Sequence, residues 1–223
     1  MAGDPAPSAR PSNRIRVRRN PKKGRYDRAA IAGILDRALF AHVAFVEDGE
    51  PYCIPMLCAR VGDEVYIHGS RASRALRTLG QGVPACLTVT LLNGLVLARS
   101  VFEHSANYES VIAFGRFRTV SDPQERLSAL EAFTEKLLPG RWAEVRPPNA
   151  KELKATSILA MEIAEASAKC RTGPPDDDES PDAALETWAG EIPIVTRFGT
   201  PVASPGLRPG IPLAASVRRL LGG

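Results

Sequence analysis

Residues 42–68 read HVAFVEDGEPYCIPMLCARVGDEVYIH, and this stretch decides the fold. Three apolar, partly β-branched runs are separated by Asp48-Gly49 and by Gly62-Asp63, and both pairs are typical of tight turns between strands. Pro55 lies inside the second run and cannot donate a ladder hydrogen bond, so we expect a bulge or an unpaired stretch there. Three successive strands joined by two tight turns predict an antiparallel meander.

Helices flank the meander and interrupt the strands that follow it. Asp27 can cap an amphipathic helix over residues 26–40, Ser73 can cap another within residues 70–80, and Asp122-Pro123 opens a third. Shorter helices are predicted over residues 150–155 and 214–221. Each long helix has its apolar residues at helical spacing, so each is expected to cover the sheet with one face.

Further strands are predicted over residues 83–92, 95–102, 108–120 and 156–169, with a turn at Asn93-Gly94 between the first two. Strands and helices do not alternate regularly, which argues against a doubly wound parallel sheet. The sequence therefore predicts a mainly β fold, a small closed or nearly closed β-barrel with appended helices.

The net charge of +4 is unevenly distributed over the 223 residues. Residues 1–28 contain nine basic and two acidic side chains, a net charge of +7, whereas the rest of the chain sums to −3. We expect a basic arm over residues 1–25 that is either disordered or packed on the mildly acidic body. Nucleic-acid binding by this arm is the less favoured interpretation.

The body is expected to form one domain over residues 26–195, followed by a Pro/Gly-rich extension over residues 196–223. No apolar run approaches the roughly 18 residues of a membrane span. The N-terminal residues lack an apolar signal core, so the expected location is cytoplasmic, with no membrane partner. The four cysteines and three histidines show no zinc-binding spacing, and no metal site is predicted.

The most informative stretch for function is Tyr66–Leu76, which reads YIHGSRASRAL. A strand ends at His68, Gly69 permits a sharp turn, and two serines and two arginines then lead into a helix. Free backbone N–H groups, hydroxyls and guanidinium groups at such a point favour an anionic phosphate. The chain has neither a GxGxxG nor a Walker A sequence, so a mononucleotide fits better than a dinucleotide. The alternative is a solvated first helical turn whose serines only cap the helix.

Two further segments contain polar or aromatic candidates. His104, Asn107, Tyr108 and Ser110 belong to a polar segment, residues 99–111, between two predicted strands; they can hydrogen-bond a ligand, or they satisfy the backbone of their own loop. Arg171 is a candidate anion ligand, and Trp188 is a candidate cover for a flat ring. No GxSxG elbow is present, so a hydrolase is disfavoured, and any redox chemistry is expected to come from a bound cofactor.

Four ordered segments together resemble a known family. They are the strand Pro51–Ala59 with Pro55-Met56, the Tyr66–Leu76 stretch, the Asn-Tyr-x-Ser-Val-x-x-x-Gly run at residues 107–115 and the Lys-x-Arg-Thr-Gly-Pro-Pro…Trp-Ala-Gly-x-x-Pro ending at residues 169–193. The combination resembles the FMN-binding split-barrel proteins of the pyridoxamine 5′-phosphate oxidase superfamily. Within it, the branch of flavin-nucleotide-binding and nitroimidazole-resistance proteins is the most similar, over about residues 26–194.

The resemblance implies a homodimer of six-stranded antiparallel split barrels that holds FMN in clefts between the subunits. Ser73 and Arg74 match the positions that bind the FMN phosphate in that family, and His68 matches a histidine that faces the flavin. The candidate catalytic residue is His68. The candidate cofactor-binding residues are Ile54, Pro55, Met56, His68, Ser70, Arg71, Ser73, Arg74, Tyr108, Ser110 and Trp188.

The function that this resemblance implies is an FMN-dependent oxidoreductase acting on a small aromatic or nitro-type substrate at the dimer interface. A haem- or flavin-binding module without turnover is an alternative, in which the neutral imidazole of His68 ligates haem iron. Pyridoxamine 5′-phosphate oxidase activity itself is disfavoured, because Trp188–Pro193 contains no arginine to match the one that binds the substrate phosphate in those enzymes. A deazaflavin in place of FMN is a further alternative.

Overall fold

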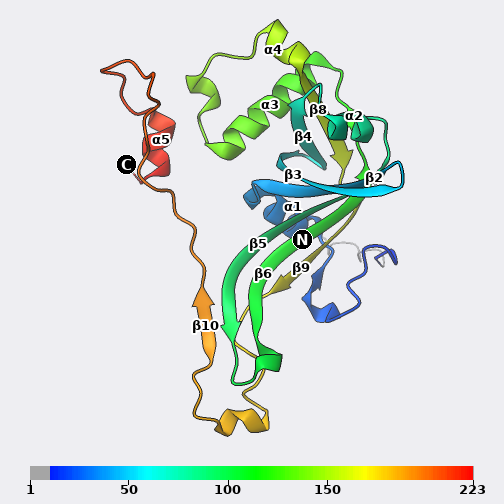
Figure 1. The fold of residues 1–223 in the computed structure, drawn as a ribbon, viewed down its shortest axis with the longest axis vertical. Helices are drawn as coiled ribbons and strands as arrows, with labels where there is room; N and C mark the ends of the chain where they lie inside the picture. The colour runs from blue at the N-terminus through cyan, green and yellow to red at the C-terminus, as the bar shows by residue number, and fades with distance from the viewer. Residues whose placement is uncertain (1–10, 223) are drawn as a thin grey trace, which may run out of the picture.

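The computed structural model describes residues 11–222, in which ten strands form one antiparallel sheet (Figure 1). The strands are β1 (Gly24–Arg25), β2 (Phe40–Glu47), β3 (Glu50–Val61), β4 (Glu64–Ser70), β5 (Pro84–Leu97), β6 (Ser105–Arg116), β7 (Arg118–Thr119), β8 (Thr156–Glu162), β9 (Glu165–Arg171) and β10 (Gly190–Pro193). Their order across the sheet is β1-β9-β6-β5-β2-β3-β4-β8-β7, and β10 pairs with β5 outside this path. The fold is mainly β, as predicted.

The predicted meander is confirmed. β2 and β3 form a hairpin whose turn residues, Asp48 and Gly49, have φ angles of 53° and 82°. This left-handed backbone at both positions is the conformation that an Asp-Gly pair favours in a two-residue hairpin. Gly62, with φ of 58°, turns the chain from β3 into β4.

Of the two alternatives expected at Pro55, the bulge is wrong, because β3 continues in register and Pro55 lies opposite His42. The unpaired stretch is confirmed on the other edge of β3, which β4 does not reach at Pro55. The N–H of Cys58 points to the β2 side, where it donates to the carbonyl of Leu39 (3.1 Å). Backbone N–H groups alternate in direction along a strand, so the nitrogen of Pro55 faces the other edge. β4 pairs only with Cys58–Val61, and the missing N–H therefore costs no ladder bond.

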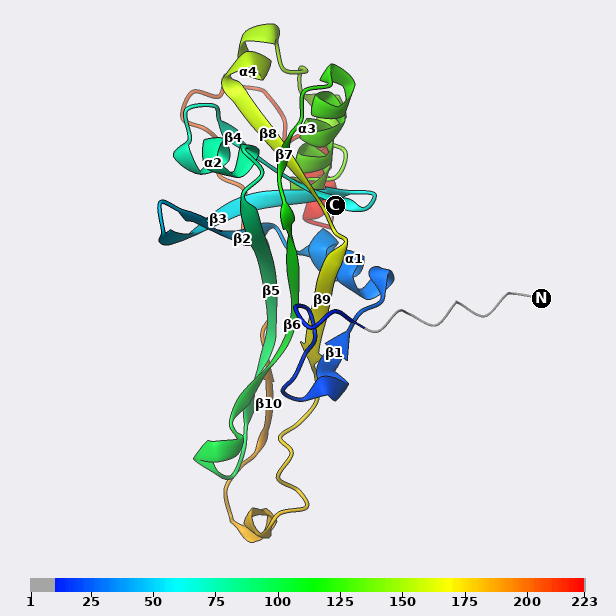
Figure 2. The ribbon, with the colours of Figure 1, turned by 90° about the vertical axis from the view of Figure 1, so that its right-hand side faces the viewer.

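The last predicted strand, residues 156–169, is two strands in the structure, β8 and β9, and it closes the barrel because each half pairs with a different strand. The chain bends at Ile163 and Ala164, so β8 pairs with β4 and β9 pairs with β6. Figure 2 shows β8 passing directly into β9 along one side of the molecule. With β8 and β9 counted as the two halves of one bent strand, six long strands make the split barrel, while β1, β7 and β10 are short additions.

The turn predicted at Asn93-Gly94 is also wrong. β5 runs through both residues, and its pairing with β6 only shifts register between Leu92 and Gly94. β10 lies alongside at this point, and a Cβ atom on Gly94 would come within 3.0 Å of the carbonyl of Ile192. Gly94 therefore allows a close strand approach rather than a chain reversal.

Helices pack against the strands of the barrel. They are α1 (Arg28–Arg37), α2 (Arg74–Gly80), α3 (Pro123–Leu137), α4 (Ala150–Ala155) and α5 (Ala215–Leu220), with 3₁₀ turns η1 (Pro21–Lys23), η2 (Val101–Glu103), η3 (Trp142–Glu144) and η4 (Pro181–Ala184). The predicted caps are present: the side chains of Asp27, Ser73 and Asp122 accept hydrogen bonds from the first turns of α1, α2 and α3. None of the described helices is long and apolar enough to cross a membrane.

Two apolar clusters stabilise these layers. The larger one lies between α1, α2 and the inner face of the barrel. The smaller one lies between α3 and the strands β3, β4 and β8. Its members are Ala59, Tyr66, Val120, Ala129, Phe133, Ile158 and Ala160. This second cluster fixes α3 beside His68, which is the first component of the candidate site.

Both ends of the chain extend from the barrel. The described part of the basic arm, residues 11–25, packs on the acidic body: Ser12 and Arg14 bond to Glu165, and β1 pairs with β9. Residues 1–10 lie outside the described residues. At the other end, residues 194–214 run past the sheet to α5, which contacts the loop that follows α3 (Figure 1).

Candidate functional site

His68 lies on β4 and lines a cavity of about 460 Å³ under α3. The Phe133 ring meets its imidazole edge to face, with 4.2 Å between the ring centroids. Nδ1 of His68 is buried and has no hydrogen-bond partner among the described residues. Burial lowers the pKa of His68, so the imidazole is neutral near pH 7. The site therefore presents a neutral nitrogen base in a largely apolar cavity.

Most of the cavity wall comes from α3 and the loop after it. The apolar lining residues are Leu57, Leu130, Phe133, Leu137, Trp142 and Val145. The loop is held to α3 because the Glu135 carboxylate accepts hydrogen bonds from the N–H groups of Gly140 (2.6 Å) and Trp142 (2.8 Å). An ion pair between Arg146 and Glu152 (2.5 Å) lies on the same wall.

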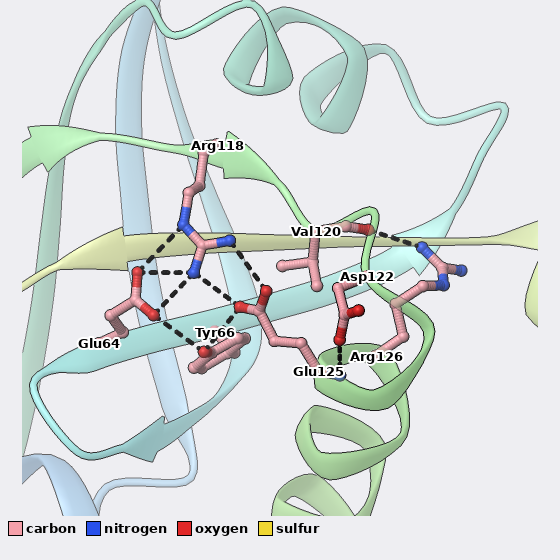
Figure 3. A network of polar contacts seen from close by, with 7 residues as sticks. All are labelled: Glu64, Tyr66, Arg118, Val120, Asp122, Glu125 and Arg126. Atoms are coloured by element: carbon pink, nitrogen blue, oxygen red, sulfur yellow. Dashed lines mark hydrogen bonds and ion pairs between the residues drawn. The ribbon is translucent and has the colours of Figure 1, made fainter.

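A network of charged groups ties α3 to the sheet (Figure 3). The guanidinium of Arg118 lies between the carboxylates of Glu64 (2.7 Å) and Glu125 (2.6 Å). The Tyr66 hydroxyl donates toward the same two carboxylates at 3.0 Å. The hydrogen bond from Arg118 is the main cause of the lowered pKa of Glu125, which keeps that carboxylate charged. The network thus orients the helix that covers His68.

The predicted phosphate cradle at the start of α2 is only partly assembled in one chain. The Ser73 side chain caps α2 by accepting from the N–H of Leu76 (3.5 Å). The Arg74 guanidinium forms an ion pair with Glu47 (3.2 Å) and lies over the Tyr52 ring, 4.4 Å from its centroid. Arg74 remains more than half exposed, so it can still bind an anion from solvent.

The other two members of that cradle point elsewhere. Ser70 ends β4 opposite Thr156, and its hydroxyl accepts from the N–H of Ala72 (3.2 Å). Arg71 lines a separate cavity together with Arg126 and Lys154. The motif YIHGSRASRAL therefore divides its side chains among three places: the His68 cavity, the Arg74 site and the Arg71 cavity.

The predicted ring-binding residues on β3 alternate between the two faces of the sheet. Ile54 and Met56 are half-buried and pack on the main core, whereas Pro55 is exposed on the opposite face. Leu57 lies on that same face and lines the His68 cavity. A ligand ring resting on β3 would therefore meet Ile54 and Met56 on the face of Tyr52 and Arg74, or Pro55 and Leu57 on the face of His68.

The remaining candidates lie away from His68 in the single chain. Tyr108 and Ser110 are on β6, where the Ser110 hydroxyl donates to the carbonyl of Lys169 (3.2 Å). Trp188 is 64% exposed and lies against Gly190. Arg171, a candidate anion ligand, is buried and donates to Asn107, Gly173 and Pro174. Arg171 therefore ties the chain after β9 to β6 through Nη1 and Nη2, and its role as an anion ligand stays a prediction.

Sequence reasoning missed the residues that surround His68. Leu130, Phe133 and Leu137 showed helical spacing and were interpreted as an ordinary core-facing stripe. In the structure Phe133 belongs to the smaller apolar cluster and also contacts the imidazole. The aromatic residues Phe133 and Trp142 were the available signal, but no local pattern links them to His68.

The curled antiparallel sheet, closed by one bent final strand, defines the split-barrel class of fold. A family model described as pyridoxamine 5′-phosphate oxidase matches residues 27–170. The chain therefore belongs to the pyridoxamine 5′-phosphate oxidase family, as the four sequence segments had indicated. No curated protein matches the chain significantly.

Two solved structures are similar over nearly the whole chain. One is the flavocytochrome Anf3 from Azotobacter vinelandii, with 41% identity, a TM-score of 0.87, and coverage of 94% of this chain and 97% of that one. The other is described as an FAD and haem binding protein from Mycobacterium smegmatis, with 43% identity, a TM-score of 0.84, and coverage of 89% and 97%.

A third solved structure shares only the fold. It is described as a candidate 5-nitroimidazole antibiotic resistance protein from Bacteroides thetaiotaomicron, with 18% identity and a TM-score of 0.56. The match covers 66% of this chain and 85% of that one. The split barrel is thus common to all three structures, whereas high identity over the whole length is found in the first two.

Proposed function

We propose that this chain is a flavin- and haem-binding redox protein in which His68 ligates the haem iron. The observation that carries the proposal is the neutral, unpartnered imidazole in an apolar cavity. Two proteins with more than 40% identity over nearly the whole chain are described as a flavocytochrome and as an FAD and haem binding protein. Both descriptions support a second prosthetic group beside the flavin that the sequence suggests.

The residues around His68 fit a haem. The cavity wall is apolar and aromatic, which suits a flat macrocycle, and a neutral imidazole is a common ligand of haem iron. Arg146, beside Glu152 on the same wall, offers a cation to the carboxylates of such a group. The lowered pKa also makes His68 a poor proton donor near pH 7, which favours ligation over acid catalysis.

The flavin is assigned to the exposed side of α2 and β3. Its phosphate would bind Arg74 with the backbone at the Ser73 cap, and its ring would lie along β3 at Ile54, Pro55 and Met56. FMN is the flavin implied by the sequence resemblance, and FAD is the alternative suggested by the description of one similar structure. When bound, these groups supply the electron transfer, and the chain binds and orients them and excludes water.

The proposed assembly is a homodimer in which flavin lies between the subunits. Apolar side chains on the exposed outer parts of the sheet support it. Val101 and Phe102 are about nine-tenths exposed at the β5–β6 connection, and Trp188 and Ile192 are exposed along β10. The proposed activity is that of an oxidoreductase acting on a small aromatic or nitro-type substrate at this interface.

The haem assignment predicts the visible spectrum of the purified protein. We expect a Soret band that is lost or strongly shifted in His68→Ala, because the iron loses its imidazole ligand. His104→Ala removes an exposed imidazole and should leave the band unchanged. Absence of haem from protein produced with an adequate haem supply, or an unchanged Soret band in His68→Ala, would contradict the proposal.

The flavin assignment predicts a loss of affinity in Arg74→Ala. We expect weaker flavin binding by about 1–3 kcal/mol, the range for a hydrogen bond to a charged group, measured by calorimetry. Arg28→Ala removes an exposed arginine paired with Asp63 and serves as the control. Equal dissociation constants for the two variants and the parent would show that the phosphate binds elsewhere.

A further inference from the structure

A second cavity, of about 520 Å³, opens beside the end of β4 and is separate from the cavity of His68. It lies between Arg71, the start of α3, the helix α4 and the start of β8. The two cavities share no lining residue, and α4 contributes to both: Glu152 lines the His68 cavity, whereas Leu153 and Lys154 line this one. We call it the basic cavity, since its charged lining residues are Arg71, Arg126 and Lys154.

One of the three cations is fixed by the backbone. The guanidinium of Arg126 donates to the carbonyls of Val120 (3.0 Å), Leu153 (2.7 Å) and Thr156 (2.8 Å). These bonds join the chain before α3 to the end of α4 and the start of β8. Arg126 therefore shapes the wall of the basic cavity and places a permanent positive charge in it.

The other two cations are available to a ligand. The side chains of Arg71 and Lys154 are exposed, and neither has a hydrogen bond or ion pair among the described residues. No carboxylate is among the lining residues. The three acids next to lining residues in the sequence are occupied: Asp122 caps α3 through the N–H of Glu125 (2.7 Å), Glu125 pairs with Arg118 (2.6 Å), and Glu152 pairs with Arg146.

The rest of the lining suits an organic ligand that bears an anionic group. Ser121 and Ser157 add hydroxyls near the cations, while Pro123 and Leu153 give apolar surface. We propose that the basic cavity binds an organic phosphate, with the phosphate between Arg71 and Lys154 and the body of the ligand against the apolar wall. A fork-shaped guanidinium and a mobile ammonium together match a multiply charged phosphate better than a single carboxylate.

This phosphate can come from two sources. It can belong to a separate small phosphate ester, or to a flavin dinucleotide whose other phosphate binds Arg74. The second source rests on the proposed function, because it requires a bound flavin. The first does not, so the two can be tested separately.

The experiment measures adenosine 5′-monophosphate, FMN and FAD binding to the full-length protein by calorimetry. The test variant is Arg71→Ala/Lys154→Ala. The matched control is Arg77→Ala/Lys151→Ala, which removes two cations from the same segments, α2 with its preceding loop and α4, at positions that do not line the cavity. Adenosine is the uncharged control ligand.

A separate phosphate ester predicts that adenosine 5′-monophosphate binds, that adenosine does not, and that the test variant loses about tenfold or more in affinity. A flavin source predicts the same loss for FAD with FMN unaffected. The proposal would be overturned if neither adenosine 5′-monophosphate nor FAD bound the protein. It would also be overturned if both bound the test variant as tightly as they bind the control variant. Failure of both flavins alone would contradict the proposed function and leave the result for the nucleotide standing.

Discussion

His68 buries a ring nitrogen where no described protein group bonds to it. Such a group costs about 1–3 kcal/mol relative to a hydrogen-bonded one, and native proteins contain few of them. The neighbouring aromatic ring of Phe133 gives no compensating hydrogen bond. The residue therefore lowers the stability of the ligand-free fold, and a ligand recovers that loss only if it reaches Nδ1.

This cost predicts a dependence of stability on pH. The pKa of His68 is lowered by burial, so the unfolded state takes up the proton first as the pH falls below about 6.5. Stability contributed by the neutral imidazole is present above that pH and is lost toward the folded-state pKa. The free energy of unfolding of the cofactor-free protein should fall by at most about 1.4 kcal/mol per pH unit from this group.

Urea unfolding at several pH values between about 7.5 and 5.5 measures this effect, in the range where histidine titrates. His68→Phe should flatten the curve relative to the parent protein. His104→Phe, which changes an exposed ring, should not. The explanation would fail if the parent and both variants lost stability in parallel.

At the scale of elements, features set by neighbouring residues could be predicted from the sequence, whereas features set by contacts between distant residues could not. The caps at Asp27, Ser73 and Asp122 were predictable because a cap involves only the next few residues. The turn expected at Asn93-Gly94 failed because β10, almost a hundred residues later, pairs across that point. In the same way, the sequence located the candidate site to the YIHGSRASRAL stretch. The division of its side chains among three places could not be predicted, because it depends on α3 and α4, which are distant in the sequence.

Closure of the barrel depends on a close contact between β6 and β8. Gly115 on β6 lies under Met161 of β8, and a Cβ atom added there would come within 2.8 Å of the Met161 Cγ atom. A side chain at position 115 is therefore excluded by the neighbouring Met161 side chain and not by an unusual backbone angle of Gly115. Overpacking of this kind typically costs about 1–3 kcal/mol.

We therefore predict that Gly115→Ala lowers the free energy of unfolding by about 1–3 kcal/mol in urea titrations. Gly33→Ala, inside α1, is the control because an added Cβ atom meets nothing closer than 3.9 Å there. That change should be neutral or stabilising, since alanine favours helix over glycine. A Gly115→Ala protein as stable as its parent would mean that Met161 moves aside without cost.

On the scale of the whole molecule, the end of the chain is joined to the candidate site. Residues 194–214, here called the strap, lead from β10 to α5, which contacts the loop after α3 (Figure 1). The backbone N–H and the hydroxyl of Ser216 donate to the Glu144 carboxylate at 2.8 Å and 2.5 Å. Glu144 belongs to η3, and the loop around it contributes Trp142 and Val145 to the cavity of His68.

The contact between Ser216 of α5 and Glu144 gives the C-terminal helix a way to influence ligand retention in the cavity of His68. If α5 holds the η3 loop in place, then releasing α5 lets that loop open more often, and a ligand in the cavity leaves faster. The loop keeps its second anchor through Glu135, so the barrel itself should stay folded. The effect should therefore appear in local opening rather than in global stability.

We predict that Ser216→Ala, and more strongly deletion of residues 214–223, speeds amide hydrogen exchange in residues 138–149. One lost hydrogen bond of about 1 kcal/mol corresponds to roughly fivefold faster local opening, and release of haem should accelerate in parallel. Ser204→Ala, on the exposed strap, is the control and should change neither rate. If the deletion left exchange in this loop unchanged, α5 would contact the loop without stabilising it, and the C-terminal helix would have no influence on the cavity.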